Sequence, residues 1–138
     1  MNWNYNFIKS RGHGSFEPSY TFNSKTTSSE NRWMYVNDII NSHEEFQKGD
    51  GSNQWTYEAF KAADTFTKRE NASKVKIPVM LFQAGKDEYV KEGGQNKFAK
   101  YAENCELVKL DDSMHSIFTE RDEIQKPYIE KLIEFYDK

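Results

Sequence analysis

The sequence has little of several features that would point to a particular class of protein. One cysteine, Cys105, among 138 residues rules out a disulfide within the chain and fits a reducing compartment, for which we expect the cytoplasm. No stretch approaches the roughly 20 apolar residues of a transmembrane helix. Residues 1–11 contain polar asparagines and no apolar run, so they do not resemble a secretory signal.

An excess of positive charge is absent, and histidine and cysteine are scarce. The formal net charge is −3, and no basic stretch is interleaved with aromatics, so neither nucleic acid nor an acidic membrane surface is an expected partner. The 3 histidines and the cysteine are scattered without zinc-ligand spacing, and we expect no metal and no other cofactor. His43 lies beside two glutamates, but adjacent residues do not share a helix face, which favours a solvated helix end.

The length and composition are those of one soluble domain. Residues 1–28 are polar and rich in Ser and Thr, and we interpret them as an irregular segment. Helical spacing of apolar residues predicts a helix from Ser29 to Phe46, and Thr27 with Glu30 has the spacing of a capping box. After a turn cluster, a second apolar stripe predicts another helix, with members Trp55, Ala59, Ala62, Ala63 and Phe66.

The pattern changes in the second half, where strands and helices alternate. The continuous apolar run Ile77–Phe82 predicts a strand buried on both faces, as in parallel sheets. A helix over 93–103 and a strand over Cys105–Leu110 follow, and the last helix is expected to have Pro127 in its first turn. The fold class is therefore α/β, with the order strand–helix–strand–helix. Two strands alone do not make a stable, doubly covered sheet, so more strands are needed.

Two polar residues follow the predicted strands at positions where chemistry is common. Asp87 lies just past the first strand and His115 just past the second. Parallel neighbouring strands bring such loops together, and an aspartate there can accept the Nδ1–H of a histidine and leave Nε2 as a general base. An aspartate after a glycine is also a common turn residue, and a lone histidine is often a surface or packing residue. Both interpretations stay open on spacing alone.

A resemblance to a known family favours the catalytic interpretation. The stretch from Pro78 to Val90, around Asp87, resembles the one that carries the triad aspartate in lysophospholipases and monoacylglycerol lipases, which are serine hydrolases. The stretch from Met114 to Glu120, around His115, is similar to the one with the triad histidine. The two residues are 28 positions apart, and the order Asp then His is that of α/β-hydrolases. Similarity to the family's cap region involves Thr26–Glu30, Arg32, Gly51–Ser52, Trp55 and Glu58–Ala59.

The chain departs from the family at the nucleophile. The family uses G-x-S-x-G on a sharp strand-to-helix turn, and the sequence contains no such motif. Gly12–Ser15 and Gly49–Ser52 have the wrong spacing and no preceding apolar strand, although Gly12-His13-Gly14 has a distant likeness to an oxyanion loop. Ser116 stands where the family usually has an acidic residue. Cys105 has no flanking histidine and is interpreted as a strand residue.

The resemblance implies the C-terminal portion of an α/β-hydrolase fold, with a helical cap over 29–70 and a core portion over 75–138. It implies a carboxylic ester hydrolase acting on lipid esters, with Asp87 and His115 as catalytic residues and the nucleophile-bearing half absent. We therefore expect the chain alone to be inactive and to form homo-oligomers or to pair with the missing half. The alternative is a non-catalytic fragment or interaction module of the same fold.

Overall fold

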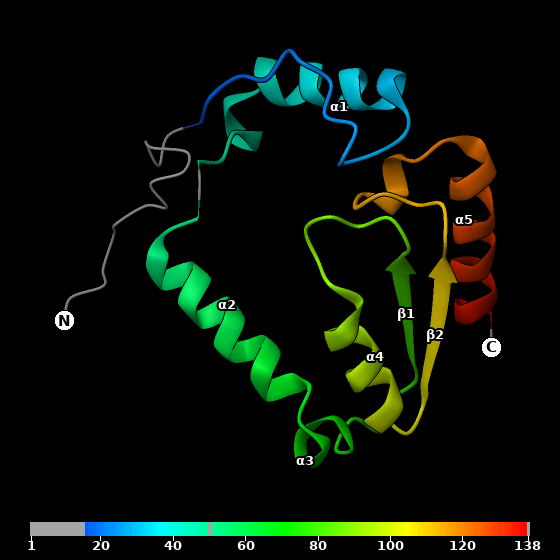
Figure 1. Cartoon of the computed structure of the whole chain (residues 1–138). Coiled ribbons are helices and arrows are strands. Elements are labelled where there is room, and N and C mark those ends of the chain that lie inside the picture. The colour runs from blue at the N-terminus through cyan, green and yellow to red at the C-terminus, as the bar shows by residue number, and fades with distance from the viewer. Residues whose placement is uncertain (1–15, 50, 138) are drawn as a thin grey trace.

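The computed structural model describes residues 16–49 and 51–137, shown in Figure 1. Residues 16–28 have no regular helix or strand. The elements that follow are the helices α1 (Glu30–Ser42), α2 (Asn53–Phe66), α3 (Arg69–Ala72), α4 (Glu92–Tyr101) and α5 (Asp122–Tyr136), the short 3-10 helices η1 (Glu44–Phe46) and η2 (Ile117–Thr119), and the strands β1 (Val79–Ala84) and β2 (Cys105–Leu110).

The strands β1 and β2 pair in parallel, and α4 connects them. The register runs from Val79 opposite Cys105 to Ala84 opposite Leu110. The predicted strand–helix–strand–helix order is confirmed, and the first strand begins two residues later than expected. The carboxyl ends of both strands therefore lie at the same edge of the sheet, where the loops with Asp87 and His115 begin.

Helices cover both faces of this small sheet. Neighbouring side chains along a strand point to opposite faces. Gln83 of β1 donates a hydrogen bond to Gln95 of α4 at 3.0 Å, whereas Phe82 packs edge-on against Tyr128 of α5 with ring centroids 4.7 Å apart. Figure 1 shows α4 and α5 on either side of the strands. The result is a three-layer arrangement of helix, sheet and helix.

The prediction that the first strand is buried on both faces is wrong. Gln83 is the buried residue of β1, and the apolar residues Val79–Phe82 are only half-buried. The described residues contain two strands, so the sheet is too narrow to enclose its own apolar side chains. The buried hydrophobic residues are dispersed over several elements: Trp33, Ala72, Ala102 and Ile124.

The first predicted helix is shorter than expected. α1 ends at Ser42 because His43 adopts an extended backbone, with φ −129° and ψ 105°, and η1 follows as a separate turn. The predicted capping box is also wrong. Ser29 is the N-cap residue, and Thr27 is fully buried, where its hydroxyl donates to the Thr119 carbonyl oxygen at 2.8 Å. A tertiary contact has replaced the local cap.

The second predicted helix is confirmed as α2. Ser52 caps it by accepting a hydrogen bond from the Trp55 backbone N–H at 3.1 Å. Its aromatic side chains are not core residues, however, because Trp55 is 66% exposed and Phe66 62% exposed. Figure 1 shows α2 extending away from the sheet. The apolar stripe of α2 is therefore not covered within the described residues, whereas Trp33 of α1 is buried.

The last helix begins earlier than the sequence indicated. α5 starts at Asp122, so Pro127 lies inside the helix and not in its first turn. The first turn carries Asp122 and Glu123, whose negative charges stabilise the positive end of a helix dipole. No helix in residues 16–49 and 51–137 is long and apolar enough to cross a membrane.

Candidate functional site

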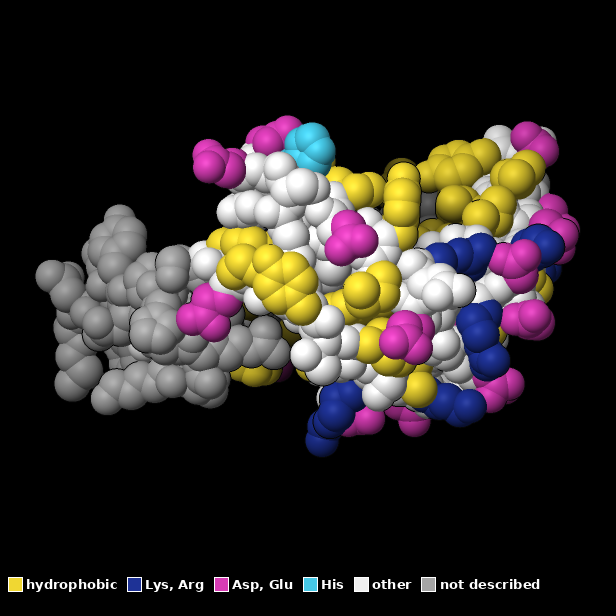
Figure 2. All heavy atoms as spheres, turned by 90° about the horizontal axis from the view of Figure 1, so that it is seen from above, with side chains coloured by type: hydrophobic (Ala, Val, Ile, Leu, Met, Phe, Trp, Pro, Cys, Tyr) yellow, Lys and Arg dark blue, Asp and Glu magenta, His cyan; other side chains and the backbone are white. Residues whose placement is uncertain are grey.

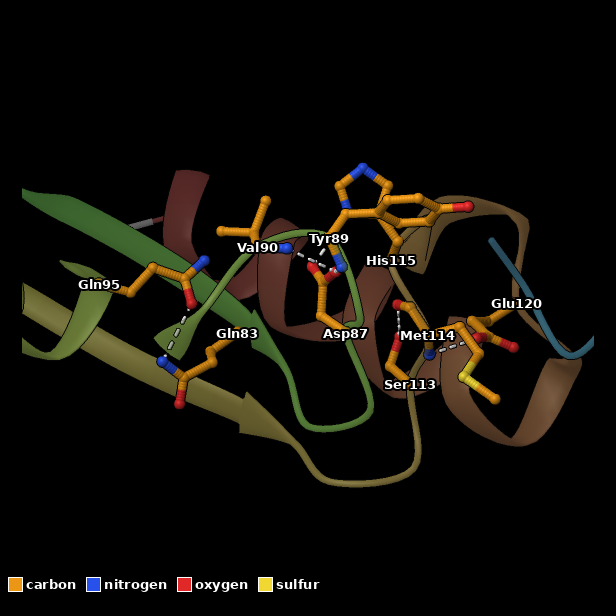
Figure 3. A network of polar contacts seen from close by, with 9 residues as sticks. All are labelled: Gln83, Asp87, Tyr89, Val90, Gln95, Ser113, Met114, His115 and Glu120. Carbon is orange, nitrogen blue, oxygen red and sulfur yellow. Dashed lines mark hydrogen bonds and ion pairs between the residues drawn. The ribbon is translucent and has the colours of Figure 1, made fainter. Parts of the chain in front are cut away.

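Asp87 and His115 lie side by side at the carboxyl end of the sheet, in the loops that follow β1 and β2. Asp87 Oδ2 is 2.9 Å from His115 Nδ1, so the predicted hydrogen bond between the two side chains is present. The Asp87 side chain is 10% exposed and that of His115 is 40% exposed. Figure 3 shows the second ring nitrogen of His115 pointing away from Asp87. This atom has no hydrogen-bond partner among the described residues and faces outward.

Close backbone packing holds the two loops together. The Gly85 N–H donates to the Leu110 carbonyl oxygen, and the Lys86 N–H donates to that of Ser113, both at 2.9 Å. A Cβ on Gly85 would lie 2.5 Å from the Asp111 carbonyl oxygen, which is backbone and cannot move aside easily. Glycine at this position therefore permits the approach that brings Asp87 to His115.

The loop after β1 fixes the Asp87 carboxylate. Asp87 Oδ1 accepts hydrogen bonds from the backbone N–H groups of Tyr89 at 2.8 Å and Val90 at 2.9 Å. Burial acts to raise the pKa of Asp87, but the Val90 N–H, the His115 ring and the Tyr89 N–H outweigh it and hold this pKa below its ordinary value. Asp87 is therefore an ionised acceptor, suited to orient an imidazole and to stabilise its protonated form.

The loop that carries His115 is fixed on both sides of the histidine. The Met114 N–H donates to Glu120 Oε1 at 2.6 Å, and the Ser116 N–H donates to the Thr26 carbonyl oxygen at 2.7 Å. The ring of Tyr89 packs edge-on against the His115 ring, with centroids 5.1 Å apart. These contacts connect the histidine to the segment that leads into α1.

Glu120 and Thr27 are two residues whose role in this site sequence reasoning missed. Both are fully buried. Glu120 belongs to the stretch that resembles the family's histidine motif, and an acid placed shortly after the histidine was the available signal. Thr27 gave only a local capping pattern, because its partner Thr119 is 92 residues away.

The other residues considered from sequence do not join this site. Cys105 is half-buried in β2, and burial raises the pKa of its thiol, which disfavours the thiolate. His43 lies at the exposed end of α1, with Nδ1 3.2 Å from Glu45 Oε1. No cluster of metal-binding side chains occurs in the part of the chain that the structure describes. Gly12–Ser15 lie outside the described residues.

A parallel β-α-β unit with an aspartate after one strand and a histidine after the next is the arrangement of α/β-hydrolases. Comparison with known families gives the same class. Residues 6–122 match the family described as serine aminopeptidase, S33, and the chain belongs to this family. The predicted α/β-hydrolase fold is thereby confirmed.

A solved structure supports the fold independently. A soluble variant of monoglyceride lipase from Saccharomyces cerevisiae, in complex with a substrate analogue, superimposes with a TM-score of 0.66 at 18% sequence identity. The match covers 88% of this chain and 43% of the lipase chain. This chain therefore spans less than half of that relative. No curated protein matches the sequence.

Proposed function

We propose that this chain supplies the acid and the base of a serine hydrolase that cleaves carboxylic esters of lipids. The observation that carries the proposal is the hydrogen bond between Asp87 and His115, with the other ring nitrogen directed outward. Asp87 accepts the Nδ1–H of His115, so that Nε2 is free to take a proton from a serine hydroxyl. The ionised Asp87 then stabilises the imidazolium that forms. The lowered pKa of Asp87 is consistent with this role.

The serine must come from outside this sequence, which has no G-x-S-x-G motif. We propose that the nucleophile and the remaining strands belong to polypeptide that completes the sheet, and that this chain has no esterase activity alone.

Lysophospholipase or monoacylglycerol-lipase activity is proposed from the resemblance around Asp87 and His115 and from the monoglyceride lipase whose fold is similar. Residues 29–70 would be the cap over the acyl chain. The cytoplasm is proposed from the single cysteine.

The test asks whether a serine becomes reactive only when the site is complete. The chain alone, incubated with a chromogenic acyl ester and an organophosphorus probe of activated serines, is expected to show background hydrolysis and no labelling. Coexpression with the product of an adjacent reading frame that carries G-x-S-x-G is expected to give a labelled serine. Replacing His115 by Ala in that complex should abolish the labelling, because the serine then lacks its base.

Two results would contradict the proposal. Stoichiometric labelling of a serine in the chain alone would show that the nucleophile lies within it. A labelled complex whose reactivity is unchanged in His115→Ala would show that His115 is not the base. The alternative, a non-catalytic interaction module, would be supported if Met1 is the natural start and no neighbouring frame carries the motif.

A further inference from the structure

Glu120 is a buried carboxylate that the proposed triad chemistry does not use. It is fully inaccessible to solvent. Its Oε1 accepts the Met114 N–H at 2.6 Å, and its Oε2 accepts the Ser28 N–H at 3.0 Å and the Ser28 hydroxyl (Figure 3 shows the first of these contacts). No lysine, arginine or histidine of the described residues forms an ion pair with this carboxylate. Hydrogen-bond donors therefore satisfy both of its oxygens, as a buried carboxyl group requires.

The two backbone groups that Glu120 holds belong to distant parts of the chain. Met114 immediately precedes His115, whereas Ser28 lies at the start of α1, 92 residues before Glu120. The same two segments are joined on the other side of the histidine by the Ser116 N–H and the Thr26 carbonyl oxygen. The backbone of His115 is thus held between two anchors, and both reach the segment that leads into α1.

Two arginines add hydrogen bonds around the junction that Glu120 forms between the histidine loop and the segment before α1. Arg121 Nε donates to the Ser28 hydroxyl at 3.0 Å, and Arg32 donates to the Glu120 carbonyl oxygen and to the Asp122 carboxylate. The Ser28 hydroxyl therefore donates to Glu120 and accepts from Arg121. These contacts order Glu120 itself, so that its side chain is a fixed element of the junction.

We propose that Glu120 is a positioning residue for His115, which acts through the Met114 N–H and ties the histidine loop to the start of α1. The proposal rests on the proposed function, because position matters only if His115 is the base. Both carboxylate oxygens are needed as acceptors. In Glu120→Gln, one of them becomes an amide NH₂ that must face the N–H of either Met114 or Ser28, so one anchor is lost.

The test measures the His115 ring directly in this chain, independently of activity. Two-bond proton–nitrogen NMR correlations from the non-exchanging ring protons report which nitrogen carries the proton. In the wild type, the Asp87 contact should hold nearly all of the ring in the Nδ1–H tautomer. In Glu120→Gln, a displaced loop should convert this signal to a mixture of both tautomers. Glu103→Gln is the matched control, since Glu103 is exposed and pairs with Lys76.

The outcome distinguishes this inference from the proposed function. A folded Glu120→Gln with the wild-type tautomer signal would overturn the inference, whatever the serine probe shows in the completed enzyme. If Glu120→Gln does not fold, Ser28→Ala decides. This variant removes the hydroxyl contact and keeps the Ser28 N–H, so a smaller shift toward mixed tautomers supports the inference and an unchanged ring contradicts it.

Discussion

A Cβ built on Gly85 would lie 2.5 Å from the carbonyl oxygen of Asp111 and 2.6 Å from its Cα. Gly85→Ala is therefore expected to push the two loops apart and to destabilise the protein by about 1–3 kcal/mol, the usual cost of overpacking. Gly93→Ala is the control, because a Cβ there meets no atom within 4 Å and the site is in α4. It should stabilise by about 0.5–1 kcal/mol. Urea unfolding of both variants measures the difference, and equal effects would contradict the close approach.

The Asp87 contact predicts a specific loss of activity in the completed enzyme. In Asp87→Asn, Oδ1 can still accept from the Tyr89 and Val90 N–H groups, which leaves an amide NH₂ facing His115. The ring must then accept at Nδ1 and carry its proton on Nε2, where it cannot take the serine proton. The kcat is expected to fall by about 10⁴-fold. Asp112→Asn, in the loop after β2, is the control, since Asp112 is exposed and pairs with Lys86. An Asp87→Asn enzyme as active as this control would refute the assigned role.

The lowered pKa of Asp87 also predicts a dependence of stability on pH. The folded-state pKa lies below the ordinary value of 3.8. Ionised Asp87 therefore contributes stability that is fully present above that value and is lost as the pH falls through the folded-state pKa. The difference in unfolding free energy between the wild type and Asp87→Asn should be largest near neutral pH and should shrink below about pH 4. If the difference in unfolding free energy instead grew as the pH fell, the folded-state pKa of Asp87 would be raised, which would contradict a hydrogen-bonded, ionised carboxylate.

Local sequence patterns predicted the elements that position the site. The apolar run predicted β1, and the alternation of strands and helices included β2 over Cys105–Leu110. Parallel pairing of the two strands was enough to bring Asp87 near His115. These inferences succeeded because the apolar pattern of a strand and the order of elements along the chain can be read from neighbouring residues. The catalytic role of the pair stays a prediction until activity is measured.

Features that depend on distant residues were not accessible in the same way. Thr27 has the local pattern of a helix cap, but a carbonyl oxygen 92 residues away offers a buried alternative. Glu120 lies in the stretch that resembles the histidine motif, but its contacts with Ser28 and Met114 could not be predicted from that stretch alone, because Ser28 is 92 residues away. The burial of β1 was overestimated. An apolar strand indicates that both of its faces are covered in the complete protein, but it does not show whether the covering residues belong to the same sequence.

The exposed apolar surface leads to a prediction about association. In the part of the chain that the structure describes, β1 and β2 have no other strand beside them, so each leaves an edge of backbone donors and acceptors unpaired. Helix α2 adds exposed aromatic side chains, of which Trp55 is 66% and Phe60 70% accessible. Figure 2 shows hydrophobic side chains reaching the surface in several places on the face seen from above. Surfaces of this kind are uncommon on soluble monomers.

We therefore expect the chain alone to self-associate at micromolar concentration, by joining sheet edges or by packing α2 of one copy against another. Sedimentation velocity should show a species larger than a monomer. Phe60→Lys should shift the distribution toward monomer if α2 forms the contact, whereas Tyr136→Lys, on α5 with 77% exposure, serves as the control for added charge. If Phe60→Lys leaves the oligomer unchanged, the contact is assigned to the sheet edge. A peptide that pairs with this edge as an extra strand should then compete with self-association. A wild-type chain that is monomeric and unfolds cooperatively at an ordinary temperature would contradict the prediction, because residues 1–70 would then cover the sheet sufficiently by themselves.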